Sequence, residues 1–261
     1  MSDESNGARK FPRRTILRHS GTIAAVGAIS ALSTAASHPA AAAPAREPKL
    51  PSTVAGVRIP NSGVCKEAVR LARSVCPEPL FHHVMRTYVF GSLLFDRRGV
   101  HYDQELVFIA AILHDLGLVE SFQSRTERFE VDGADAAQRF LEERQVPAER
   151  VELVWDAIAL HTSAGIATRK RPEIALISVG SGLDFSGNGL QQIPSDDLEE
   201  VLTAFPRKGF KQDALDRMIS LCRTKPAAEL MHPFAEVGRR HIPDFSVPTV
   251  EDLLLAAPFE E

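Results

Sequence analysis

A histidine–aspartate pair, His114 and Asp115, interrupts the apolar run between Ile109 and Leu118. A charge buried without a partner is costly, so this pair needs one. Imidazole nitrogens and carboxylate oxygens are ordinary ligands of divalent metal ions. Adjacent residues on a helix point about 100° apart, so both reach one ion only near a helix end, just before Gly117. The pair therefore indicates either a hydrogen bond at the end of a buried helix or part of a metal site.

Two further residues are candidate ligands for the same ion. His83 is favoured over His82 because it shares a helical face with Arg86 and with Gly91, a residue that allows close approach of another helix. Asp184 lies among small and apolar residues, where a surface aspartate would be out of place. The four side chains come from three separate segments, so the fold must bring these segments together.

The segments that carry these residues are predicted to be helices. Apolar residues recur at steps of three and four, whereas no segment alternates over a convincing strand length and no hairpin turn joins two β-rich runs. We therefore predict an all-α fold, a single bundle of about eight to ten helices. The expected helices cover residues 64–75, 80–95, 104–116, 132–143, 147–161, 172–184, 195–204, 211–222, 226–240 and 249–256.

The first 45 residues are predicted to be an export signal and not part of the fold. Arg13 and Arg14 begin a segment that resembles a twin-arginine signal, an Ala/Gly-rich apolar run follows, and residues 40–45 offer cleavage sites. We expect residues 1–45 to direct export to the periplasm or the extracellular space, residues 46–60 to be a linker and residues 61–257 to form one domain. The alternative is a disordered Ala-rich tail. The run is too short and too weakly apolar to span a membrane, so no membrane association of the mature form is expected.

Composition limits the partners of the mature chain. The first 45 residues hold five of the 30 basic and two of the 34 acidic residues, which leaves a formal net charge of −7 and argues against nucleic acid. Three cysteines make a poor disulfide framework, and Cys65 and Cys76 on one helix would be ~16 Å apart, beyond the ~7 Å that a disulfide allows. A small-molecule substrate is the expected partner. The oligomeric state stays open, with a homo-oligomer as one option.

The longer motifs resemble a known family. The order of His83, the His114–Asp115 pair and Asp184 resembles the signature of the HD superfamily of metal-dependent hydrolases. Within it, the motifs are similar to those of the cyanamide hydratase-like branch, which usually has His-Ser where this chain has His83-Val84. The similar segments are 83–88 (HVMRTY), 111–117 (AILHDLG), 128–134 (RFEVDGA), 155–162 (WDAIALHT) and 182–184 (GLD), and the likeness covers about residues 75–240.

The resemblance implies an all-α fold in which His83, His114, Asp115 and Asp184 bind one divalent ion. That ion is zinc in cyanamide hydratases, with iron or manganese as alternatives here. Family members with two metals carry further histidines, typically two, between the His-Asp pair and the last aspartate. Here His161 alone lies in that interval, so a second metal site looks incomplete.

Four more residues are expected around the substrate. His161 is expected to donate or relay a proton, and otherwise to be a cation at a helix end. Thr162 is expected to contact the substrate beside it. Arg86, one turn after His83, either reaches the same pocket or lies on the surface. Phe129 is expected to contact the substrate from a loop that, with Glu130, folds over the site as a lid.

The implied reaction is the addition of water to a small nitrile such as cyanamide, which gives urea. A divalent ion lowers the pKa of bound water toward ~7 and so supplies a nucleophile, with Asp115 orienting it and His161 and Thr162 serving the nitrogen that gains a proton. One alternative is hydrolysis of a phosphomonoester or nucleotide, with Arg86 or the basic run 169–171 binding phosphate. Another is a metal-containing binding module without turnover.

Overall fold

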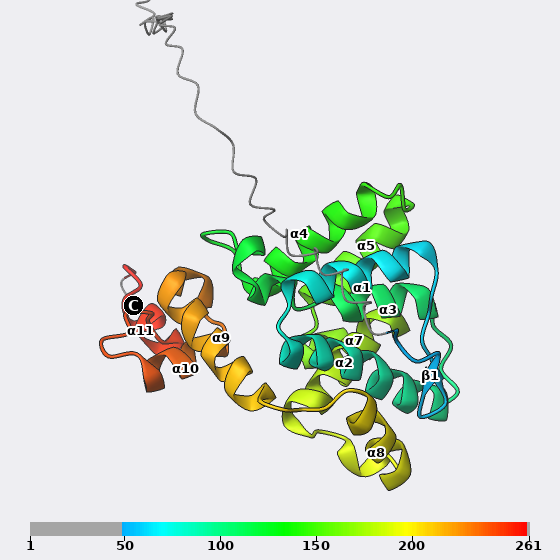
Figure 1. The fold of residues 1–261 in the computed structure, drawn as a ribbon. Helices are drawn as coiled ribbons and strands as arrows, with labels where there is room; N and C mark the ends of the chain where they lie inside the picture. Colours follow the sequence, from blue (N-terminus) through cyan, green and yellow to red (C-terminus); the bar gives the residue numbers. More distant parts are fainter. Residues whose placement is uncertain (1–48, 260–261) are drawn as a thin grey trace, which may run out of the picture. The chain divides into compact units, whose positions relative to one another are not determined.

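The computed structural model describes residues 49–259, so the expected export signal lies outside the described residues. The predicted all-α fold is confirmed for this part of the chain (Figure 1). The α-helices are α1 (Gly63–Val75), α2 (Glu78–Arg97), α3 (Gln104–Leu113), α4 (Phe129–Glu142), α5 (Ala148–Ala159), α6 (Ala164–Ala167), α7 (Pro172–Ser186), α8 (Ser195–Ala204), α9 (Phe210–Thr224), α10 (Phe234–His241) and α11 (Val250–Leu255). Short 3-10 helices are η1 (Leu116–Leu118), η2 (Glu120–Phe122), η3 (Leu190–Gln192) and η4 (Pro226–Glu229). Within the described residues, no helix combines the length and apolar character needed to cross a bilayer.

The prediction that the chain has no hairpin is wrong for residues 53–58. Strands β1 (Thr53–Val54) and β2 (Val57–Arg58) pair in antiparallel fashion around Ala55 and Gly56, whose φ angles of 48° and 76° are those of a tight hairpin turn. Val54 and Val57 are buried in the domain core, so this part of the expected linker belongs to the domain. Strands of two residues are too short to show an alternating pattern in the sequence.

Helix α2 is the central element of the bundle, because α7, α3 and α9 all pack against it. Its side chains are buried almost continuously from Leu80 to Phe95, which explains why it lacks a polar face. The closest approach is to α7: a Cβ on Gly180 would lie 2.1 Å from the carbonyl oxygen of Thr87, and one on Gly91 would lie 2.9 Å from that of Leu176. The predicted close approach at Gly91 is therefore confirmed, and it holds His83 and Asp184 on facing helices.

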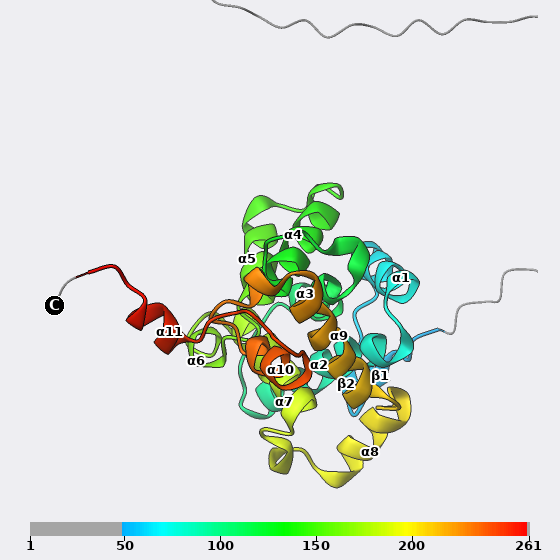
Figure 2. The same cartoon turned by 90° about the vertical axis from the view of Figure 1, so that its left-hand side faces the viewer.

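Helices α3, α4, α9 and α10 pack around the rest of the bundle. Helix α3 packs against α1, α2, α5 and α7, while α4 lies against α5 and η1. Helix α9 lies against α2, and α10 packs on α9 (Figure 2). Two cations tie α9 and the residues just after it to the rest of the domain: Arg217 donates to the carbonyl of Leu118 at 2.9 Å, and the buried Lys225 pairs with Asp132.

Candidate metal centre

The His114–Asp115 pair lies just beyond helix α3 and not in its last turn. The helix ends at Leu113, three residues earlier than expected, and Asp115 has φ −101° and ψ 14°, in the bridge region where many active-site residues sit. In this turn the two side chains lie close together, with His114 Nε2 3.4 Å from Oδ2 of Asp115. Gly117 allows the start of α4 to pack closely on this segment, because a Cβ there would lie 1.9 Å from the carbonyl oxygen of Phe129.

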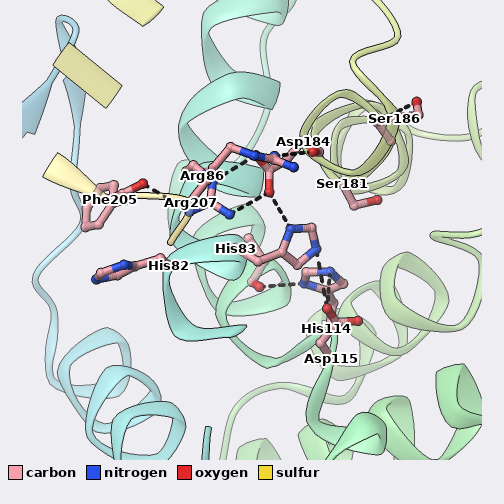
Figure 3. A network of polar contacts seen from close by, with 12 residues as sticks. His82, His83, Arg86, His114, Asp115, Ser181, Asp184, Ser186, Phe205 and Arg207 are labelled. Carbon is pink, nitrogen blue, oxygen red and sulfur yellow. Dashed lines mark hydrogen bonds and ion pairs between the residues drawn. The ribbon is translucent and has the colours of Figure 1, made fainter. Parts of the chain in front are cut away.

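Three histidines converge on the Asp115 carboxylate. The Nε2 atoms of His83 and His114 each lie 3.4 Å from its Oδ2, and the Nε2 of His161 lies 3.8 Å from its Oδ1. Figure 3 shows His83 between Asp184 on one side and the His114–Asp115 pair on the other. All four converging residues are buried, so the cluster is largely screened from bulk water.

The opposite ring nitrogen of each histidine fixes its tautomer. Nδ1 of His83 lies 2.7 Å from an Asp184 oxygen, Nδ1 of His114 lies 2.8 Å from the Ala111 carbonyl, and Nδ1 of His161 lies 2.7 Å from the Ile158 carbonyl. These partners are acceptors, so each Nδ1–H donates and each neutral ring keeps a lone pair on Nε2. That lone pair is the one that binds a metal ion.

Burial favours the metal-binding protonation state of His114 and His161. It lowers the pKa of His114 to about 3, with the nearby His83 adding to the effect. It likewise lowers the pKa of His161 to about 4, helped by His114. Burial also raises the pKa of Asp115, against the opposing influence of His83 and His161. A carboxylate in this setting is stabilised by a cation, which a divalent ion provides.

A buried histidine nitrogen without a hydrogen-bond partner indicates that these residues fit a divalent ion. His114 Nε2 is buried without a hydrogen-bond partner, although its ring is held firmly from the other side. Ligand atoms of His83, His114 and Asp115 all lie within 4.8 Å of one another. Two imidazoles and a carboxylate at this spacing are typical of zinc, iron or manganese sites.

Asp184, the predicted fourth ligand, lies outside that group of three. It accepts hydrogen bonds from His83, from Nε of Arg86 at 2.8 Å and from a terminal nitrogen of Arg207 at 2.6 Å. Burial opposes its ionisation, but the hydrogen bonds from His83 and Arg86 outweigh burial and hold its pKa well below the usual range. In this arrangement Asp184 orients the His83 ring from behind, and Arg207, which sequence reasoning missed, helps to hold Asp184.

A pocket of about 270 Å³ opens beside the cluster. We call the part of its lining made by His83, Asp115 and His161 the polar floor. The other polar lining residues are Thr162, Ser178, Ser181 and His232. Most of the remaining wall is apolar. Its side chains come from Leu80, Leu118, Phe129, Ala164, Phe185, Phe210, Ala214, Met218, Pro233 and Phe234.

The expected lid is wrong in its structure. Phe129 is the first residue of α4 and is buried, so it lines the pocket from a helix and not from a loop. Glu130 points to Thr162, whose hydroxyl donates to it at 2.5 Å. The predicted helix 132–143 therefore starts three residues too late, and its first turn was assigned to the preceding loop.

The predicted phosphate-binding cations lie away from the pocket. The guanidinium of Arg86 is fully buried and bonded to Asp184 and to the carbonyls of Phe205 and Pro206. In the basic run 169–171, Arg169 donates to a helix carbonyl, Lys170 lies 4.0 Å from Asp156 and Arg171 lies 3.4 Å from Glu173. Among the described residues, no lysine or arginine lines this pocket.

One wall contains a buried charge cluster that sequence reasoning missed. His232 lies between two carboxylates, with its Nε2 3.0 Å from Glu130 and its Nδ1 2.7 Å from Glu229. Burial opposes its protonation, but hydrogen bonds to Glu130 and Glu229 outweigh burial and raise the pKa of His232. A single histidine in a segment without clear periodicity gives no sequence signal for this role.

Comparison with known families agrees with this geometry. Residues 80–204 match the family model of the HD domain. The match supports membership of the HD superfamily, as the resemblance implied, while the cyanamide hydratase-like branch stays a prediction. No curated protein matches the chain significantly.

Proposed function

We propose that this chain, which carries an HD domain, is a metal-dependent enzyme that adds water to a small uncharged molecule, with a nitrile such as cyanamide as the first choice. HD-domain proteins are generally metal-dependent hydrolases. The observation that carries the proposal is the convergence of three imidazole Nε2 atoms on Asp115, at the floor of a pocket that no lysine or arginine of the described chain lines.

His83, His114 and Asp115 are the residues that would hold the ion, and His161 lies at the edge of the same group. Zinc is the first choice for two imidazoles and a carboxylate, with iron and manganese as alternatives. When bound, the ion supplies Lewis acidity, which makes water reactive at neutral pH.

The protein's own residues would manage orientation and protons. Addition of water to a nitrile forms a C=O double bond, breaks both π bonds of C≡N and moves both water protons to nitrogen, so that cyanamide gives urea without a further reactant. His161 has its Nδ1 fixed by the Ile158 carbonyl, so its Nε2 faces the pocket floor and can receive and return a proton. Thr162, held by Glu130, lies next to it on the same wall.

Phosphate chemistry is the weaker candidate for this site. Phosphoester hydrolysis relies on cations directed at the charge of the transferring group. Arg86 is committed to Asp184, and the cations of the basic run 169–171 contact groups outside the pocket. The charge distribution therefore favours an uncharged substrate over an anionic one.

The test is turnover by the purified, metal-loaded protein with cyanamide beside a panel of phosphomonoesters. Urea formation that stops on chelation and in His114→Gln, but continues in the exposed control His101→Gln, is the expected result. Phosphate release without urea formation would instead identify the protein as a phosphohydrolase. Ligand binding that needs no metal, with no turnover of either class, would identify a binding module and refute the proposal.

A further inference from the structure

The segment that follows the HD-domain match supplies one wall of the pocket. The three residues of the metal cluster all lie within residues 80–204. Later residues also line the pocket: Phe210, Ala214 and Met218 on α9, and Pro233 and Phe234 at the start of α10. The residues suited to the reaction and the residues that shape much of the pocket are therefore separate parts of the chain.

This wall lies directly against the imidazoles. The ring of Phe210 stacks on His83 with centroids 4.7 Å apart and an angle of 20°. Phe234 stacks on Phe129 at 5.1 Å and 5°, and Phe129 meets the His161 ring edge-on at 5.5 Å. A substrate that reaches Asp115 must therefore lie beside aromatic and aliphatic surface.

Hydrogen bonds and ion pairs hold this wall in place. Lys225 donates to the carbonyl of Glu127 at 2.8 Å and pairs with Asp132, while His232 lies between Glu130 and Glu229. Both ring nitrogens of His232 are occupied by these carboxylates, so its polar atoms are turned away from a ligand. The pocket is consequently preformed, and its apolar character is a fixed property of the site.

The pocket is also larger than cyanamide requires. Its volume is about 270 Å³, whereas cyanamide has only three non-hydrogen atoms. Cyanamide consists of an amino group and a nitrile, and it would leave most of the apolar wall in contact with water. An apolar substituent would cover that wall and gain the free energy of removing both surfaces from water.

We propose that the pocket selects an uncharged substrate with an apolar arm, of the class of small aromatic or branched aliphatic nitriles. The reactive group lies at the floor beside Asp115 and His161, and the arm lies against Met218, Ala214 and Phe234. This inference rests on the proposed function for its reactive group. The proposed preference for an apolar arm is a difference in binding affinity, which is measured without turnover.

The experiment is calorimetric titration of the metal-free protein with benzonitrile, cyanamide and phenyl phosphate. Benzonitrile is expected to bind at least ~10-fold more tightly than either of the others. Met218→Lys, which introduces a charge into the wall, is expected to weaken benzonitrile binding by ~10-fold or more. Met231→Lys is the matched control, since Met231 is 69 % exposed and does not line the pocket; its binding should equal that of the wild type.

A second variant protects the test against misfolding of Met218→Lys. Ala214→Leu adds bulk to the same wall, so it should weaken benzonitrile binding more than it weakens cyanamide binding. Equal affinity for cyanamide and benzonitrile, tighter binding of phenyl phosphate, or wild-type binding in both wall variants would overturn the inference. Selective benzonitrile binding without amide formation by the metal-loaded protein would instead contradict the proposed function and support the selectivity.

Discussion

A single added methyl group at Gly180 tests whether the contact between α2 and α7 positions the metal centre. A Cβ at this position would lie 2.1 Å from the Thr87 carbonyl oxygen, about 1.3 Å short of ordinary contact at 3.4 Å. The three atoms nearest to this Cβ, the carbonyl oxygen and carbon of Thr87 and the amide nitrogen of Gly91, are all backbone atoms of α2, so α2 and α7 must separate. Overpacking of this kind costs ~1–3 kcal/mol, and the better helix propensity of alanine returns ~0.5–1 kcal/mol.

Gly180→Ala is therefore expected to lose about 1–2 kcal/mol of stability, which lowers Tm by roughly 2–8 °C for a domain of this size. The hydrogen bond between His83 and Asp184 joins the same two helices, so metal affinity should fall by ~10–100-fold. Urea unfolding and titration with zinc measure the two effects.

Gly182→Ala is the matched control on the same helix. A Cβ there would meet no atom within 4 Å, so this variant should gain ~0.5–1 kcal/mol from helix propensity alone. The reasoning is refuted if Gly180→Ala is as stable as Gly182→Ala and binds zinc as tightly as the wild type.

Three further predictions follow from the charges of the molecule. Because folding raises the pKa of His232, its protonation stabilises the fold below pH 6.5, and this stabilisation is lost as the pH rises through the pKa of the folded state. Because folding lowers the pKa of Glu130, its ionisation also stabilises the fold, and this second stabilisation is lost as the pH falls below 4.5. His232→Gln should therefore lower the free energy of unfolding in urea by ~2 kcal/mol between these pH values and by less above them. The exposed control His241→Gln should lower it little. A loss of stability in His232→Gln that does not change with pH would contradict this prediction. Asp184→Asn should weaken zinc binding by ~10–100-fold, and complete loss of binding would instead make Asp184 a ligand. Finally, we propose export through the N-terminal signal, so Lys-Lys in place of Arg13-Arg14 should retain precursor in the cytoplasm, and unchanged secretion would refute it.

The sequence was sufficient for the helical scaffold, and three of its four candidate ligands, His83, His114 and Asp115, lie together in the structure. Long helices such as α2 and α7 are predicted from apolar residues that recur at steps of three and four. The His114–Asp115 pair stands out because polar residues in an apolar run need partners. The choice of His83 follows from the helical face it shares with Gly91, and the structure turns His82 the other way, to the Pro206 carbonyl.

Features that depend on distant or very short segments could not be predicted. The ion pair of Lys225 with Asp132 joins residues 93 positions apart, and no local pattern specifies such a contact. The same holds for His232, which reaches Glu130 across 102 positions. The close packing of α4 on Gly117, where a Cβ would lie 1.9 Å from the Phe129 carbonyl oxygen, is likewise a contact that no local pattern specifies.

Metal content of the purified protein tests the central claim most directly. Elemental analysis after zinc loading and removal of unbound ion is predicted to give one divalent ion per chain, lost in His114→Gln and retained in His101→Gln. Absence of bound metal in the wild type, or the same content in His114→Gln as in the control, would contradict a metal centre at His83, His114 and Asp115.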